Sequence, residues 1–243
     1  MNTRFASRGE APPTDAARPG ILVWDAPVRV LHWLMVLSFT GAYLTAESER
    51  FSLLHVTLGY TMAGLVGFRI LWGLVGTKHA RFSNFVRAPK AAARYLGSML
   101  RGEPEHHTGH NPAGALAIVC LLGLAAATTA SGWATYNDFA GGWTEDFHEG
   151  AAGLMLAVVG VHVAGVLLGS WLHRENLVAS MVSGLKRGRP EEGIRAAWRT
   201  VAALVLASVL GFWWLQWQHA PTGNALTARQ DTTAMHRGHH RDD

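Results

Sequence analysis

The stretch TEDFHEGAAGLMLAVVGVHVAGVLLGSW, residues 144–171, places two histidines, His148 and His162, within or at the start of a long apolar run. A helix that crosses a bilayer needs about 20 mostly apolar residues, and this run provides them. An ionisable side chain inside a membrane is costly and usually serves a function. The stretch therefore predicts a transmembrane helix that carries two functional histidines.

The rest of the chain has the same membrane character. Of its 243 residues, 49% are hydrophobic and only 16% are charged, compared with about 25% charged residues in soluble domains. Its single cysteine, Cys120, excludes a disulfide within the chain and a cysteine-based metal site. The predicted fold is an all-α integral membrane helical bundle, a four-helix core plus a fifth C-terminal transmembrane helix. The expected spans are 26–46, 53–76, 112–134, 147–171 and 199–217.

Charges in the loops predict the orientation. The segments 77–111 and 172–198 are rich in Lys and Arg, whereas 135–147 has three acidic residues and no basic one. Because basic loops stay on the cytoplasmic side, we expect a multi-pass protein of the bacterial inner membrane with a cytoplasmic N-terminus and a periplasmic C-terminus. The same bias explains the sequence pI near 9.6, so no nucleic-acid partner is expected.

Four histidines of the spans match in depth. His32 lies early in the first span, on the inner side, and His55 starts the second span, on the outer side. His148 starts the fourth span on the outer side, and His162 lies about 21 Å deeper at 1.5 Å per residue. Fourteen residues fall only roughly 40° short of four full turns, so both rings of the fourth span face the same direction. The depths pair His32 with His162 and His55 with His148.

Two imidazoles at one level are the axial ligands that a haem iron takes from facing helices. The pattern therefore favours two haem b groups, stacked as an electron path across the bilayer. A single histidine near a span end is more often an interfacial polar residue, but four matched by depth are hard to explain in that way. Arg69 lies fourteen residues after His55, so it faces the same interior, where a haem propionate would balance its charge. Its alternative is snorkelling to the inner interface.

Several motifs together resemble the bacterial cytochrome b-561 family: VWDAPVRVLHW (23–33), the histidine near the start of the second span, GFRILWGLVGTKHARF (67–82) and the H-x13-H pair of the fourth span. This family includes the b-type cytochrome subunit of membrane-bound nickel–iron hydrogenases and, more distantly, the gamma subunit of formate dehydrogenase. The resemblance covers about residues 20–188. The fifth span and the tail are outside it.

The resemblance implies a dihaem cytochrome b of four helices, with the same pairing of His32 and His162. It also implies that electrons pass between the quinone pool and a partner redox protein, such as a hydrogenase or a c-type cytochrome. Such a protein is a non-catalytic electron-transfer subunit. The expected organisation is a polar cytoplasmic N-terminus (1–20), the dihaem domain (21–188), a linker with the fifth helix (189–217) and a polar histidine-containing tail (218–243).

Two other functions stay open. One is a quinol-dependent oxidase that acts on a small oxidant such as superoxide. The other is a histidine-rich metal transporter. Clusters of histidines outside the spans can also bind metal; they are His106, His107 and His110 in the loop and His236, His239 and His240 in the tail.

Overall fold

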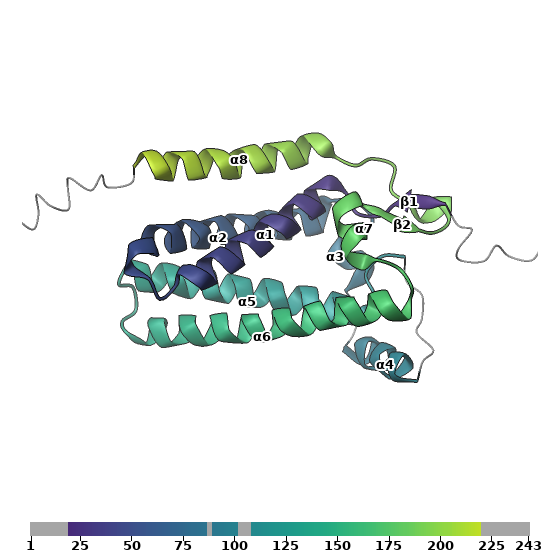
Figure 1. Ribbon diagram of the computed structural model, residues 1–243, viewed down its shortest axis with the longest axis horizontal. Helices are drawn as coiled ribbons and strands as arrows, with labels where there is room; N and C mark the ends of the chain where they lie inside the picture. Colours follow the sequence, from purple (N-terminus) through teal and green to yellow (C-terminus); the bar gives the residue numbers. More distant parts are fainter. Residues whose placement is uncertain (1–18, 87–88, 102–107, 220–243) are drawn as a thin grey trace, which may run out of the picture.

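The computed structural model describes residues 19–86, 89–101 and 108–219. Its long helices are α1 (Ala26–Thr45), α2 (Ser52–Val75), α5 (Pro112–Tyr136), α6 (Trp143–Leu172) and α8 (Arg199–Gln218). Its short elements are β1 (Gly20–Leu22), η2 (Glu49–Phe51), α3 (Phe82–Phe85), α4 (Pro89–Leu100), α7 (Leu177–Ser183), β2 (Leu185–Arg187) and η3 (Pro190–Glu192). Figure 1 shows the long helices side by side along one direction.

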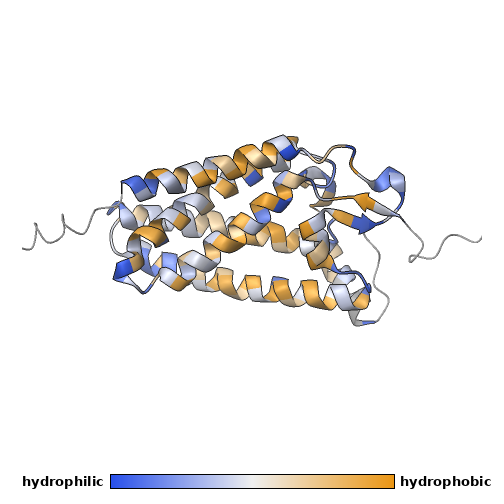
Figure 2. Cartoon of the chain, turned by 45° about the horizontal axis from the view of Figure 1, so that its top comes forward, coloured by the Kyte–Doolittle hydropathy of each residue, from blue (hydrophilic) through white to orange (hydrophobic). Residues whose placement is uncertain are grey.

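The five predicted spans are confirmed. Each of the five long helices is long and apolar enough to cross a membrane, and their outer faces carry large apolar side chains such as Leu44 and Trp217, which are 77% and 80% exposed. Figure 2 shows apolar residues along the helices and polar ones concentrated near their ends. Such a surface is stable in lipid rather than in water. The chain is a multi-pass membrane protein with an all-α bundle fold.

One span boundary differs from the prediction by more than two residues. The fourth span was expected to begin at residue 147, but α6 begins at Trp143. Glu145 and Asp146 lie in its first turn, where acidic side chains interact favourably with the positive end of the helix dipole. The charges that suggested a loop in the sequence therefore belong to the start of the helix.

The helices α1, α2, α5 and α6 form the bundle, and α8 packs on its outside against α1 (Figure 1). The core between the four helices includes Met62, Val66, Ala125 and Met155. A second cluster around Leu31 is covered by side chains of α8. The fifth helix thus adds a layer to a bundle that is already closed by four.

A buried aspartate caps the first span. Asp25 precedes α1, and its Oδ1 accepts a hydrogen bond of 2.8 Å from the backbone N–H of Val28. Its Oδ2 also accepts from Trp72 Nε1 at 3.1 Å and from Thr77 Oγ1 at 2.6 Å. A buried carboxylate needs several such donors, and here they tie the start of α1 to the end of α2.

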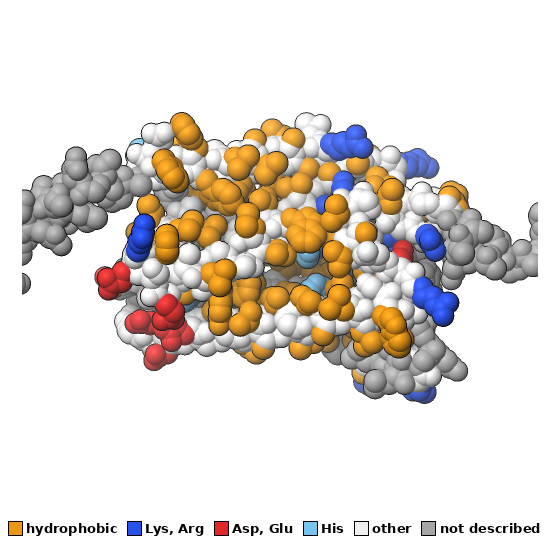
Figure 3. Space-filling model, in the orientation of Figure 1, with side chains coloured by type: hydrophobic (Ala, Val, Ile, Leu, Met, Phe, Trp, Pro, Cys, Tyr) orange, Lys and Arg blue, Asp and Glu red, His pale blue; other side chains and the backbone are white. Residues whose placement is uncertain are grey.

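Charges separate to the two ends of the bundle. We call the end where α1 begins and α6 ends the basic end; its charges include Lys78, Arg81, Arg174 and Lys186. The opposite end, the acidic end, carries Glu47, Glu49, Glu145 and Asp146. Figure 3 shows most of the acidic side chains at one end and most of the basic ones at the other.

A small antiparallel sheet at the basic end was not predicted. In it β1 pairs with β2, with Gly20 opposite Arg187 and Leu22 opposite Leu185. Strands of three residues are too short to show a periodic pattern in a sequence. The sheet joins the segment before α1 to the segment after α6.

Candidate functional site

At the acidic end, two predicted ligands lie close together with nearly perpendicular ring planes. The ring centroids of His55, at the start of α2, and His148, near the start of α6, are 6.0 Å apart with an interplanar angle of 78°. When two histidines bind one metal ion from opposite sides, the two metal–nitrogen bonds of about 2 Å each contribute roughly 4 Å to the distance between the ring centroids. The distances from each nitrogen to its ring centroid contribute the rest. The two rings are therefore spaced for one metal ion between them.

The hydrogen bonds of this pair leave one nitrogen of each ring for a metal. His55 Nδ1 lies 2.9 Å from the carbonyl oxygen of Ala42, and His148 Nδ1 lies 2.9 Å from that of Thr128. A carbonyl oxygen only accepts hydrogen bonds, so each Nδ1 donates and carries the proton. Each Nε2 then presents its lone pair, as in histidines that bind metals through one nitrogen and are oriented through the other.

A glycine makes room for His148. A Cβ atom on Gly132 of α5 would lie 2.8 Å from Cε1 of the His148 ring, closer than real Cβ contacts. The absence of a side chain at this position allows the ring to lie against α5 and to reach the Thr128 carbonyl. The position of His148 thus depends on two helices, α5 and α6.

The other two predicted ligands border one cavity. His32 of α1 and His162 of α6 both line a cavity of about 470 Å³ between the helices. Its walls are mostly apolar, with side chains such as Phe39, Met155 and Val159. A mostly apolar cavity of this size with two imidazoles on its walls fits a flat, apolar macrocycle whose iron takes histidine ligands.

Arg69 lies at the same cavity, as predicted from its spacing. It is 5% exposed, its Nη1 donates to the carbonyl oxygen of Ala80 at 3.3 Å, and its guanidinium lies 4.8 Å from the ring centroid of Phe82. No carboxylate among the described residues lies within ion-pair distance of it. A buried cation facing a cavity without a bonded carboxylate suits an anionic ligand.

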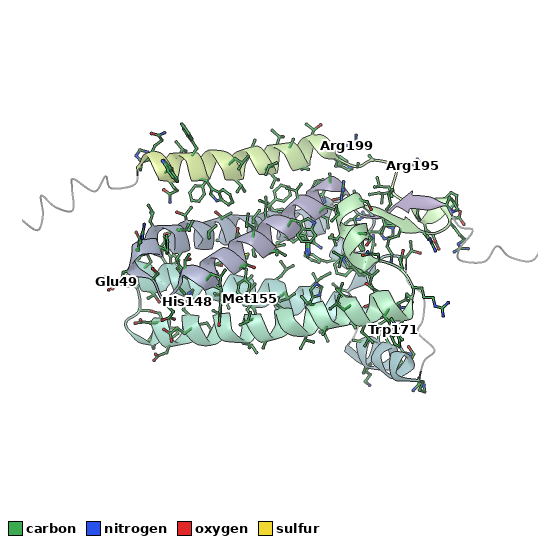
Figure 4. All side chains as sticks on the ribbon, in the orientation of Figure 1. Glu49, His148, Met155, Trp171, Arg195 and Arg199 are labelled. Atoms are coloured by element: carbon green, nitrogen blue, oxygen red, sulfur yellow. The ribbon has the colours of Figure 1, made fainter. Side chains whose placement is uncertain are left out.

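The two histidine levels are separated by packed side chains. Figure 4 shows His148 and Met155 along α6, with Trp171 toward its other end. Met155 lies seven residues from both His148 and His162, which is about 10 Å along the helix. Met62 and Ala125 pack with Met155, so an apolar layer lies between the levels.

Two histidines outside the spans, His79 and His173, form hydrogen bonds with other groups at the basic end. His79 Nε2 lies 2.8 Å from the Glu192 carbonyl oxygen, and His173 Nε2 lies 3.3 Å from the Tyr95 hydroxyl. Within the described ranges no group of three or more side chains could hold a metal ion. Of the two clusters considered from the sequence, His106, His107 and the tail histidines lie outside the described residues, and His110 lines the cavity.

Sequence reasoning did not place His110, His173, Glu175 and Lys186 at the cavity, although all four line it at the basic end. Lys186 Nζ lies 3.3 Å from Glu175 Oε2, so this pair is balanced in charge. Burial, followed by the charge of Arg69, lowers the pKa of His110 to about 3. Burial also lowers the pKa of His79. Both rings are therefore neutral near pH 7.

Comparison with known proteins fits this arrangement. A sequence model of the prokaryotic cytochrome b561 family matches residues 23–184, which include all four paired histidines. The chain belongs to the prokaryotic cytochrome b561 family. The family expected from the motifs is thus confirmed, and the protein is an electron-transfer b-type cytochrome, for which haem b is the cofactor.

Similar curated cytochromes are described as probable Ni/Fe-hydrogenase B-type cytochrome subunits. The one from Azotobacter vinelandii is 27% identical, and the match covers 70% of this chain and 91% of that protein. The one from Rhizobium leguminosarum bv. viciae is 24% identical over 69% of this chain and 89% of its own length. That from Cupriavidus necator is 27% identical over 68% and 86%. No solved structure matches the chain significantly.

Proposed function

We propose that this cytochrome b561 holds two haem b groups, one between His55 and His148 and one between His32 and His162. The observation that carries the proposal is the histidine pair at the acidic end, with its 6.0 Å spacing and both Nδ1 atoms bonded to carbonyl oxygens. The cavity bordered by His32 and His162 supports the second site. Arg69 would neutralise a propionate there.

In this function the residues of the chain hold and insulate the carriers. Haem iron, when bound, accepts and releases one electron at a time. The four histidines fix two carriers at different depths, and the layer of Met62, Ala125 and Met155 fills the space between them with apolar atoms. Among the residues that the structure describes, the cavity lining runs from Trp24 to Lys186, which supports a haem-binding unit within 21–188.

The proposed route runs between the quinone pool and a redox partner protein. The rim of the cavity includes exposed apolar residues of α1, such as Trp33 and Val36, and of α6, such as Val163 and Leu167. Figure 3 shows a hollow in this apolar face with histidine side chains inside it. An opening on the apolar surface suits a lipid-soluble quinone. A hydrogenase is one candidate for the partner, because the similar curated proteins are named for it; a c-type cytochrome is the other.

Haem counting tests the two sites. The purified protein should contain two haem b groups per chain with a low-spin reduced spectrum. His148→Ala and His162→Ala should each remove one haem, and a different one, whereas the exposed His219→Ala should keep both. If either ligand variant keeps two haems of unchanged spectrum, the proposed pairing is wrong.

Substitutions at the rim test the exchange with quinone. Leu167→Trp should slow haem reduction by a quinol analogue without changing haem content, because Leu167 lines the opening. Leu168→Trp is the matched control. Leu168 follows Leu167 in the sequence, and its side chain is also exposed but does not line the cavity. Equal rates in the two variants would contradict entry between α1 and α6.

A further inference from the structure

The cavity has a polar corner at the basic end that the proposed iron ligands do not use. His110 lines it, and its ring lies between Trp24 and Phe85, with centroid separations of 4.5 Å and 4.4 Å. Its Nδ1 is enclosed and has no hydrogen-bond partner. A buried polar atom without a partner is rare in native proteins and calls for an explanation.

The proton of the neutral His110 ring is best placed on Nε2. An enclosed N–H without an acceptor is less often tolerated than an enclosed acceptor without a donor, so the unpartnered Nδ1 is the unprotonated nitrogen. Nε2 is not among the enclosed, unpartnered atoms. The ring, which lines the cavity, therefore offers one N–H donor to a bound ligand.

The start of a long helix lies at the same corner. The 25-residue helix α5 begins at Pro112, directly after His110 and Asn111, and Asn111 and Gly114 line the cavity. The positive end of a helix dipole attracts anions. Arg69 lines the same cavity. The cavity is thus bordered by an arginine, a neutral N–H donor and a helix N-terminus. Among the described residues, the only carboxylate that borders it is that of Glu175, which is paired with Lys186.

We infer that His110 and Arg69, beside the positive end of α5, form a carboxylate pocket that holds a propionate of the haem bound between His32 and His162. The inference rests on the proposed function. It assigns to His110 a positioning role that neither its sequence context nor the iron ligands indicate. The ring is clamped by Trp24 and Phe85, so the donor is held in place before the carboxylate arrives, which lowers the entropic cost of binding.

Haem esterified at its propionates gives a direct test. Haem-free full-length protein in detergent is titrated with haem b and with haem b dimethyl ester, and uptake at the basic-end site is followed by absorbance in a His148→Ala background. His110→Phe keeps a ring between Trp24 and Phe85 but removes the donor. It should weaken haem b binding about tenfold, as expected for a hydrogen bond to a charged group, and leave binding of the diester unchanged.

His79→Phe is the matched control. His79 lies beside this corner, with its ring centroid 6.3 Å from that of Trp24, but it does not line the cavity. His79→Phe should bind haem b and its dimethyl ester with the same affinities as the unsubstituted protein. If the pocket serves a phosphate headgroup instead of the propionate, His110→Phe should lose the same affinity for both haem forms, or lose none for either. Either result overturns the inference.

A redox titration of the two-haem protein provides a second readout that does not depend on affinity. His110→Phe leaves the propionate charge less neutralised, which favours ferric iron, so the midpoint potential of one haem should fall and that of the other should stay. Two haems with unchanged potentials would overturn this inference alone. A protein that takes up no haem at the His32 and His162 level would overturn the proposed function as well.

Discussion

At the scale of single residues, the space beside His148 decides whether its ring can reach its position. The only residue type that leaves this space open at position 132 is glycine, because a Cβ there would lie 2.8 Å from the ring. Gly132→Val should displace His148 and weaken haem binding at the acidic end by at least about tenfold, as loss of an orienting contact does at metal sites. Haem content and the reduced spectrum of the purified protein measure the effect.

The same helix provides the control for this prediction. A Cβ on Gly123 of α5 meets no atom within 4 Å, so Gly123→Val should keep both haems. Full haem content in Gly132→Val would mean that the ring can move without losing its iron.

Residue identity and spacing predict part of the site but not all of it. The depths of His32, His55, His148 and His162 follow from helix rise, and the structure brings His55 and His148 together and places His32 and His162 on one cavity. His110 could not be placed in this way. Its position depends on contacts with Trp24 and Phe85, and such contacts between segments distant in sequence leave no periodic signal.

At the scale of elements, Asp25 joins two helices at the basic end. Its role as the cap of α1 could be predicted from its place before Pro27, but its bonds to Trp72 and Thr77 could not, because these residues approach only in the folded bundle. Asp25→Ala should lower the free energy of unfolding by about 2–4 kcal/mol, the sum of a lost cap and of buried donors left unpaired. Denaturant unfolding in detergent measures it.

Asn176 is a cap with fewer bonds and serves as the comparison. Its side chain accepts only from the backbone N–H of Ala179, at 2.8 Å, at the start of the exposed helix α7. Asn176→Ala should therefore cost about 1 kcal/mol or less. Equal losses in the two variants would show that the Trp72 and Thr77 bonds contribute little.

At the scale of the whole molecule, the separated charges predict the orientation in the membrane. In a Cys120→Ala background, Glu49→Cys at the acidic end should react with a membrane-impermeant thiol reagent added to intact spheroplasts. Arg195→Cys at the basic end should react only after the membrane is opened. Both positions are exposed, and Figure 4 shows them toward opposite ends. The reverse pattern of labelling would place the N-terminus outside.

The number of long helices could be predicted because apolar length and charge separation act over 20 or more residues. The packing of α8 on α1, outside the bundle, could not be predicted. Since α8 is apolar on most of its surface, no stripe of apolar residues distinguishes its contact face. The pairing of β1 with β2 was missed because contacts between distant short segments leave no local pattern.

That pairing also sets an order for biosynthesis. Leu22 leaves the ribosome early, whereas its partner Leu185 is made only after the whole of α6. Until then the nascent chain lacks the wall that Lys186 contributes to the cavity. The cavity at the basic end is therefore complete only after the fourth crossing, and a haem bound there as proposed would be enclosed at that stage.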